Sequence, residues 1–280
     1  KRAVDCVAEL DVLLSLACVS SSGSKPMSVP LFLHSSDSPS LHIEGMYHPC
    51  MVDRVVTDFV SNDVSLGSSS SSSQSSSSSA KFMLLSGPNM GGKSTLLRQV
   101  CITVILAQLG CHVPASSCVL TPVDRIFTRV GASDNMAAGR STFLVELMES
   151  STILNHATPN SLVILDELGR GTSTFDGYSV AFAATEYLSR YVGCRGLFAT
   201  HYFNLSKEFQ DCPEVALSHM SYLSENKQNQ QGEQEEEDVE DVTFLYKMED
   251  GADRNSFGRV VAKLAGVPPI ILERAKVVAR

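Results

Sequence analysis

The chain has 280 residues, of which 43% are hydrophobic and 19% charged, with a formal net charge of −9. Seven acidic residues lie between Glu233 and Asp241, so the remainder is close to neutral. At roughly 150 residues per domain the length predicts about two domains, and the composition excludes wholesale disorder, collagen, coiled coils and a strongly basic nucleic-acid-binding surface.

The cysteines and the apolar runs point to an intracellular setting. The eight cysteines never form a CxxC pair and are scattered through apolar stretches, so we expect reduced, mostly buried thiols. The longest apolar run, from Val100 to Leu109, is interrupted by Gln108 and is too short to span a membrane. The chain opens at Lys1 without a signal segment, and we expect it to be a fragment of a longer protein.

The first part of the chain predicts a helix, a break and a strand. Apolar residues recur at helical spacing from Val4 to Cys18, prolines follow, and a short strand is expected at Leu41–Gly45. Residues 1–40 are therefore assigned to the end of a helical region. Two insertions of low complexity are expected to be flexible loops: the serine run at 68–79 and the acidic, Gln-rich stretch at 225–241.

From Lys81 onward, strands and helices alternate in a pattern that predicts an α/β fold. A strand is expected at 81–86, and apolar runs suited to strands buried on both faces occur at 162–165 and 196–200. Helical patterns occur at 95–109 and 143–156, a further ordered run at 242–248, and a helix-turn-helix pattern at 258–266 and 270–280.

A glycine-rich segment joins the strand at 81–86 to the helix after it. It fits the GxxxxGK[ST] pattern and consists of Gly87, Pro88, Asn89, Met90, Gly91, Gly92, Lys93 and Ser94, followed by Thr95. Backbone N–H groups of such a loop converge on a phosphate at the helix N-terminus, the lysine reaches the β and γ oxygens, and the serine hydroxyl can ligate Mg²⁺. The alternative is a glycine-rich turn with an exposed lysine.

Polar side chains end the two later apolar strands. Asp166 would hold magnesium, and Glu167 would orient and deprotonate the water that attacks the γ-phosphate, although two carboxylates could also simply begin a loop. His201 is expected at the same sheet edge as a γ-phosphate sensor, or as an ordinary hydrogen-bonded histidine. Ser141 and Thr142 precede a helix that either could cap, and a helix N-terminus also attracts anions.

The motifs GPNMGGKST, FTRVGASDNMAAGRSTFLVEL, DELGRGTSTFDG and FATHYFNL resemble the C-terminal ATPase domain of the MutS mismatch-repair family. The similarity covers about residues 41–280 and implies an ABC-type P-loop ATPase domain at 41–256 with a dimerisation helix-turn-helix at 257–280. The family works as dimers, which implies that Ser141 reaches the γ-phosphate of the opposite subunit. It also implies that Asn89 contacts the γ-phosphate and that Phe59 and Tyr246 contact adenine, although Phe59 could instead be a core residue.

The flanking motifs and the insertions are most similar to the eukaryotic sixth MutS homologue. That resemblance implies a nuclear protein that uses ATP and Mg²⁺, pairs with the second MutS homologue, and binds mismatched DNA through segments outside this chain before engaging a MutL-type factor. Lys93, Glu167 and His201 would be the catalytic residues, with Ser94 and Asp166 as metal ligands.

Two alternatives from other classes remain. A chromosome-organising or transporter ABC ATPase would carry an LSGGQ signature, which is absent from this sequence. A non-hydrolysing ABC scaffold is disfavoured because the residues expected to carry out hydrolysis are intact.

Overall fold

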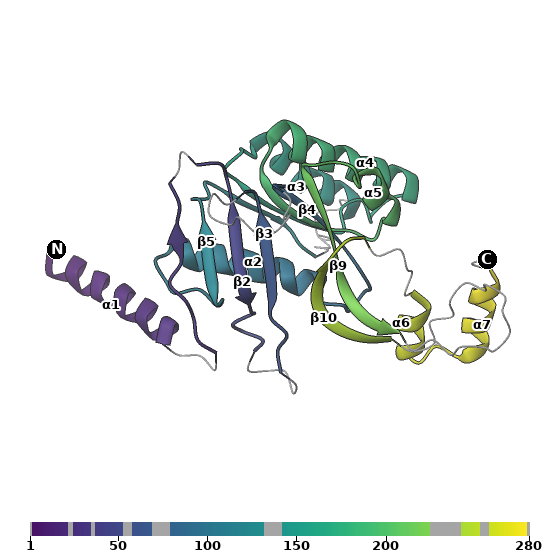
Figure 1. Cartoon of the computed structure of the whole chain (residues 1–280), viewed down its shortest axis with the longest axis horizontal. Helices are drawn as coiled ribbons and strands as arrows, with labels where there is room; N and C mark the ends of the chain where they lie inside the picture. Colours follow the sequence, from purple (N-terminus) through teal and green to yellow (C-terminus); the bar gives the residue numbers. More distant parts are fainter. Residues whose placement is uncertain are drawn as a thin grey trace.

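The computed structural model describes residues 2–21, 25–34, 37–52, 58–68, 79–131, 142–224, 242–252 and 258–278. The expected insertion at 225–241 and nearly all of the one at 68–79 lie outside these residues. The described residues form an α/β fold, as the sequence predicts, and its strands are arranged in two β-sheets (Figure 1). No helix in these segments is both long and apolar enough to cross a bilayer.

The larger sheet positions the candidate site. Its six strands have the order β10-β9-β4-β8-β7-β6, with β10 antiparallel to β9 and all other neighbours parallel. The strands are β4 (Phe82–Ser86), β6 (Ile126–Arg129), β7 (Leu162–Asp166), β8 (Arg195–Ala199), β9 (Val215–Ser224) and β10 (Val242–Asp250). Every residue of β4, β7 and β8 is buried, which confirms for β7 and β8 the expectation that these apolar runs are covered on both faces.

The smaller sheet has four strands in the order β1-β5-β2-β3. They are β1 (Leu31–Phe32), β2 (Leu41–Met46), β3 (Asn62–Leu66) and β5 (Ser117–Leu120). Buried and exposed residues alternate strictly along β3, because only one face of this sheet packs on the core. Of these strands only β2 is predicted from the sequence; β1, β3 and β5 are not, and β1 and β5 are too short to show a periodic pattern.

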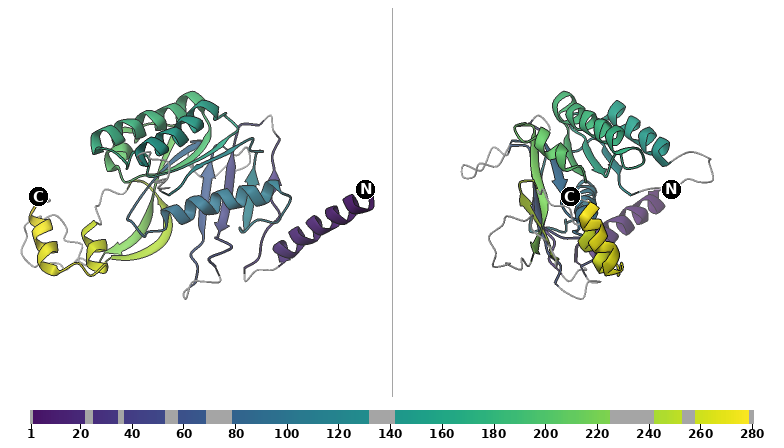
Figure 2. Two further views of the ribbon diagram at one scale, coloured as in Figure 1. Left: turned by 180° about the vertical axis from the view of Figure 1, so that it is seen from behind. Right: turned by 90° about the vertical axis from the view of Figure 1, so that its right-hand side faces the viewer.

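Helix α2 (Lys93–Gln108) packs on both sheets, and in the view from behind in Figure 2 it crosses in front of the strands of the small sheet. Its apolar side chains join one core cluster with β2, β3 and β5 on one side and with β4, β7 and β8 on the other. This position explains why buried residues cover more than one face of the helix: the neighbours Leu96 and Leu97, about 100° apart around the helix axis, are 1% and 0% exposed. The arrangement fixes the helix N-terminus at the end of β4.

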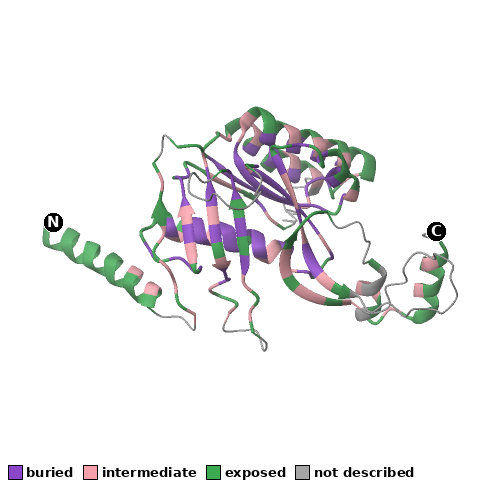
Figure 3. Ribbon diagram, viewed as in Figure 1, coloured by how far each residue is buried: buried purple, intermediate pink, exposed green. Residues whose placement is uncertain are grey.

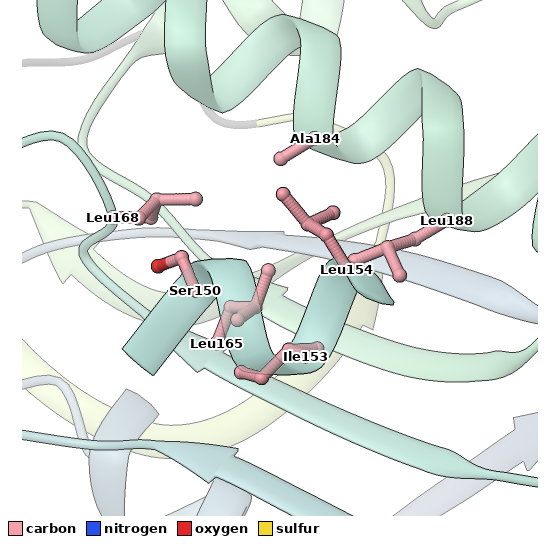
Figure 4. A pocket seen from close by; sticks show the side chains of 7 residues that line it. All are labelled: Ser150, Ile153, Leu154, Leu165, Leu168, Ala184 and Leu188. Carbon is pink, nitrogen blue, oxygen red and sulfur yellow. The ribbon is translucent and has the colours of Figure 1, made fainter. Parts of the chain in front are cut away.

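The other face of the large sheet is covered by a second helical layer. It consists of α3 (Thr142–His156), α4 (Thr174–Glu186), the π-helical turn η2 (Tyr187–Val192) and α5 (Phe203–Glu208). Ile153 and Leu154 of α3 meet Leu165, Leu168 and Leu188 around a small apolar void (Figure 4). This void is part of the packing between α3, β7 and α4, and it is separate from the candidate site.

The terminal helices are largely exposed. Helix α1 (Arg2–Ser21) projects from the body and contains no buried residue, and the same holds for α7 (Pro269–Val278), which follows α6 (Gly258–Leu264) (Figure 3). Helices therefore occur where the sequence predicts them at both ends. All eight cysteines are free thiols, and five of them are buried. Burial raises the pKa of Cys101 and Cys194 to about 12, so these thiols stay protonated at neutral pH.

Candidate functional site

The glycine-rich loop between β4 and α2 has a backbone that demands its glycines. Gly87 and Gly92 have φ of 124° and 97°, in a region that side chains rarely tolerate. A Cβ atom on Gly87 would lie 3.0 Å from the backbone nitrogen of Met220, and one on Gly91 would lie 3.0 Å from the carbonyl oxygen of Pro88. The loop therefore rests directly on β9, and only glycine fits these close approaches.

The lysine of this loop is held inside it. Lys93 is the first residue of α2 and is only 6% exposed. Its Nζ donates hydrogen bonds to the carbonyl oxygens of Gly87 at 2.7 Å and Pro88 at 2.9 Å. A buried ammonium needs such partners because leaving it unpaired is costly. Asn89 and Met90 at the tip of the loop are exposed, and Met90 has a positive φ of 70°. Thr95 is half-buried in the first turn of the helix.

Asp166 and Ser94 come together at the edge of the sheet. Asp166 ends β7, is 8% exposed and accepts a hydrogen bond from the Ser94 hydroxyl. Burial raises the pKa of this carboxyl group, whereas the Ser94 hydrogen bond and the positive charges of Lys93 and Arg98 oppose the rise. Its Oδ1 atom is buried without a hydrogen-bonding partner among the described residues.

This oxygen pair suits a hard divalent cation. The site offers one hydroxyl and one carboxylate with an unshared buried oxygen, and Mg²⁺ prefers one or two carboxylates completed by water and phosphate oxygens to an all-protein cage. Consistent with this preference, no cluster of three or more His, Cys, Asp or Glu side chains suited to a metal occurs within the described segments. The residues present therefore fit Mg²⁺ bound together with a phosphorylated ligand.

Glu167 follows Asp166 in a strained backbone conformation. Its φ is 54°, unusual for a side chain with a Cβ, and its N–H donates to the Ala199 carbonyl oxygen at 2.8 Å. Such outliers cost about 1–3 kcal/mol and concentrate at functional sites. The carboxylate forms an ion pair with Arg170, which is 66% exposed. Arg170 was not singled out from the sequence, although its position three residues after Glu167 was a usable signal.

His201 lies just beyond the end of β8, the strand between β4 and β7. Partial burial lowers the pKa of its imidazole, and the positive charges of Arg170 and Lys93 lower it further, against the opposing charge of Glu167. The ring is therefore neutral at pH 7. These mutual electrostatic effects mean that Lys93, Glu167 and His201 share one site, as their places after neighbouring parallel strands predict.

The two aromatic candidates are positioned differently. Tyr246 sits in a bulge of β10 with φ of 55°, and its ring is so close to the loop that a Cβ on Gly92 would lie 3.4 Å from its Cδ1 atom. The side chain of Asn62 clamps this bulge, donating to the Tyr246 carbonyl at 2.9 Å and accepting from the Met248 N–H at 2.6 Å. Phe59 is half-buried, and the Lys25 ammonium lies 5.9 Å from its ring centroid.

Ser141 lies outside the described residues, and α3 begins at the next residue, Thr142. Two contributing residues were not predicted from the sequence: Met220, whose backbone lies against Gly87, and Asn62, which holds the bulge. Both roles depend on strands that are distant in sequence, so no local pattern marks them.

Comparison with known proteins agrees with this geometry. Residues 83–280 match the family model described as MutS domain V. The chain is 47% identical to the DNA mismatch repair protein Msh6 of Gallus gallus over 277 residues and 45% identical to that of Homo sapiens over 276, in both cases over 98% of this chain. It is 44% identical to the Arabidopsis thaliana DNA mismatch repair protein MSH7 over 95% of this chain.

The chain spans only about a fifth to a quarter of the length of these relatives, 20% of each Msh6 protein and 24% of MSH7. The family model nevertheless covers more than half of the chain, including the glycine-rich loop, the acidic strand end and His201. The chain therefore belongs to the MutS family and is Msh6-like.

Proposed function

We propose that this chain is the ATPase domain of a MutS-type mismatch repair protein, an ABC-type P-loop domain that binds and hydrolyses Mg·ATP. One observation carries the proposal: the glycine-rich loop, the Asp166–Glu167 pair and His201 follow three neighbouring strands, β4, β7 and β8, and meet at one edge of the sheet. Open α/β sheets bind ligands at this edge.

The residues of the loop would bind the phosphates. The backbone N–H groups of the loop between Gly87 and Ser94, which Pro88 lacks, and the Lys93 ammonium would supply positive potential for the β and γ oxygens, and Asn89 would contact the γ-phosphate. Ser94 and the unshared oxygen of Asp166 would hold Mg²⁺, which neutralises phosphate charge when bound. In taking up the phosphates, Lys93 would exchange its hydrogen bonds to Gly87 and Pro88 for stronger charge-assisted ones.

Glu167 and His201 would act on the attacking water and the γ-phosphate. Glu167 would orient the water and accept its proton, and its fixed backbone keeps that carboxylate at the edge of the sheet. The neutral imidazole of His201 has one N–H to donate to a γ-phosphate oxygen. Lys93, Glu167 and His201 are thus the proposed catalytic residues.

The site would be completed by a second subunit. Ser141, at the N-terminus of α3, would reach the γ-phosphate bound to a MutS partner, and Phe59 and Tyr246 would contact the adenine of the ATP bound here. We assign residues 1–40 to the end of a lever region, 41–256 to the ATPase domain, and 257–280 to a helix-turn-helix dimerisation element. The exposed apolar side chains of α7, Ile270 and Val278 among them, are suited to such docking.

For the parent protein we propose the role that the names of its relatives give. That role is DNA mismatch repair. The family resemblance implies, in addition, that the protein would be nuclear and would pair with the second MutS homologue. Mismatched DNA would be bound by parts of the parent outside this chain, and ATP would switch that complex to a state that engages a MutL-type factor.

Nucleotide binding tests the proposal directly. Lys93→Ala should weaken the binding of a fluorescent ATP analogue by the parent protein at least about tenfold, because it removes a charge-assisted hydrogen bond to phosphate. Lys207→Ala, which removes an exposed lysine from α5, is the matched control and should leave the affinity unchanged. Equal affinity of the Lys93 variant and the control would refute the assignment.

A further inference from the structure

Gly169, two residues after Glu167, is held at both of its backbone polar groups. Its N–H donates to the Glu146 carboxylate on α3, and its carbonyl oxygen accepts a hydrogen bond from the Tyr202 hydroxyl at 3.0 Å. Glu146 is 3% exposed and Tyr202 7% exposed, so both contacts are shielded from water. We call Glu146, Gly169 and Tyr202 the Gly169 clamp.

The backbone around the Gly169 clamp leaves no room for adjustment. Gly169 has φ of 91°, and a Cβ atom there would lie 2.4 Å from the Gly177 carbonyl oxygen. A Cβ on Gly177 would in turn lie 2.3 Å from the Tyr202 hydroxyl. A Cβ on Gly171 would lie 3.0 Å from that of Phe143 in the first turn of α3. The loop after Glu167 is therefore fixed between α3 and α4.

Glu146 is a buried carboxylate shared between this loop and a strand. Its second partner is Arg129 at the end of β6, at 3.8 Å, and Arg129 also pairs with Glu149 at 3.0 Å. Glu149 lies on the same helix and forms an ion pair with the same arginine, but its side chain is 44% exposed. Comparing the two glutamates therefore separates charge pairing from loop binding: both form an ion pair with Arg129, but of the two only Glu146 accepts the hydrogen bond from the Gly169 N–H.

We propose that Glu146 is a positioning residue for hydrolysis, which acts by fixing Gly169 and so holding the Glu167 carboxylate in line with the attacking water. This inference rests on the proposed function of the site. A displacement of about 1 Å in a catalytic group can cost about 100-fold in rate, and Glu167 is joined to Gly169 by a single intervening residue. The clamp contacts no atom of the phosphate loop in these hydrogen bonds, so substrate binding should be spared.

The test uses the full-length parent protein assembled with its MutS partner. Wild type, Glu146→Ala, Glu146→Gln and the matched control Glu149→Gln are compared by the Kd for a non-hydrolysable Mg·ATP analogue, by kcat, and by thermal unfolding. We expect Glu146→Ala to lower kcat about 10- to 100-fold with Kd within about threefold. Glu146→Gln keeps an acceptor for the Gly169 N–H and should restore kcat to within about fivefold, and Glu149→Gln should match wild type.

Tyr202→Phe provides a second, milder probe, because it removes only the hydroxyl that bonds the Gly169 carbonyl. It should lower kcat severalfold, and the double variant with Glu146→Ala should lose less than the product of the two single losses, since both side chains hold the same residue. If Glu146→Ala unfolds, a kcat of Tyr202→Phe equal to wild type overturns the proposal.

Three further results would overturn it: a folded Glu146→Ala with kcat within threefold of wild type, a parallel loss of ATP affinity and kcat, or a Gln variant as impaired as the Ala variant. The last would mean that charge pairing with Arg129 is what matters. Failure of the proposed function itself is distinguishable, because then wild type and Glu167→Gln would hydrolyse ATP equally or neither would bind it.

Discussion

Arg195, at the start of β8, should be a main source of stability for the fold. It is completely buried, and its guanidinium donates to the carbonyl oxygens of Ser40, Thr121, Pro122 and Asn160 and to the Thr121 hydroxyl, at 2.6–3.1 Å. Residues 40 and 121–122 flank strands of the small sheet and Asn160 precedes β7 of the large one. One side chain thus fastens the two sheets at the edge opposite the candidate site.

Arg195→Met should lower the free energy of unfolding by about 3–5 kcal/mol. The Ser40 and Asn160 carbonyls also accept backbone N–H groups, so they keep a partner, whereas the Thr121 and Pro122 carbonyls would each lose Arg195 at a cost of about 1–3 kcal/mol. The loss of the remaining charge-assisted hydrogen bonds adds to this free-energy cost, and burial of the apolar methionine side chain offsets part of the cost. Burial lowers the pKa of Arg195 only to about 10, so the wild-type group is charged at neutral pH.

Urea denaturation followed by circular dichroism measures this difference. The matched control is Arg190→Met, which removes an exposed arginine paired with Glu186 at 2.9 Å and should barely move the midpoint. A loss below about 1 kcal/mol for Arg195→Met would refute the reasoning, because it would mean that the buried carbonyls find other partners or water.

Two further predictions concern titrating groups of the candidate site. Burial raises the pKa of Asp166 in the folded chain, so its ionised form destabilises the nucleotide-free fold once the pH exceeds the pKa of this group in the unfolded chain. Asp166→Asn should therefore raise the thermal midpoint at pH 7.5 while lowering hydrolysis about 100-fold or more. A lowered midpoint would contradict this. His201 should titrate below the usual 6.5 in the free chain when followed by NMR, and its pKa should rise on binding an ATP analogue, because a γ-phosphate favours imidazolium. No movement of that titration would remove His201 from the site.

The candidate site was predictable because its signals are local. The glycines, Lys93 and Ser94 occupy one loop whose geometry a short motif specifies, and the flanking strand and helix follow from uninterrupted and periodic apolar residues. The sequence also allowed the prediction that Asp166 and His201 lie at the same edge of the sheet, because the carboxyl ends of parallel strands share that edge.

The remaining features depend on tertiary contacts that a single sequence does not encode locally. In the sequence, Glu146 is indistinguishable from an ordinary glutamate on a helix. Its role depends on its burial and on its hydrogen bond to Gly169, 23 residues away. Arg195 reads as a surface residue beside a strand. The strands β1 and β5, of two and four residues, are defined by pairing with their neighbours rather than by their own periodicity.

The most direct test of the central claim is steady-state Mg·ATP hydrolysis by this chain, alone and mixed with the ATPase domain of the second MutS homologue, with Glu167→Gln as the inactive control. A composite site predicts a rate per subunit that rises on mixing and is lost in the Glu167 variant, and Ser141→Ala should slow hydrolysis at the partner's site while sparing ATP binding at its own. Nucleotide binding and dimer formation without any hydrolysis would contradict the account and identify the domain as a non-hydrolysing scaffold.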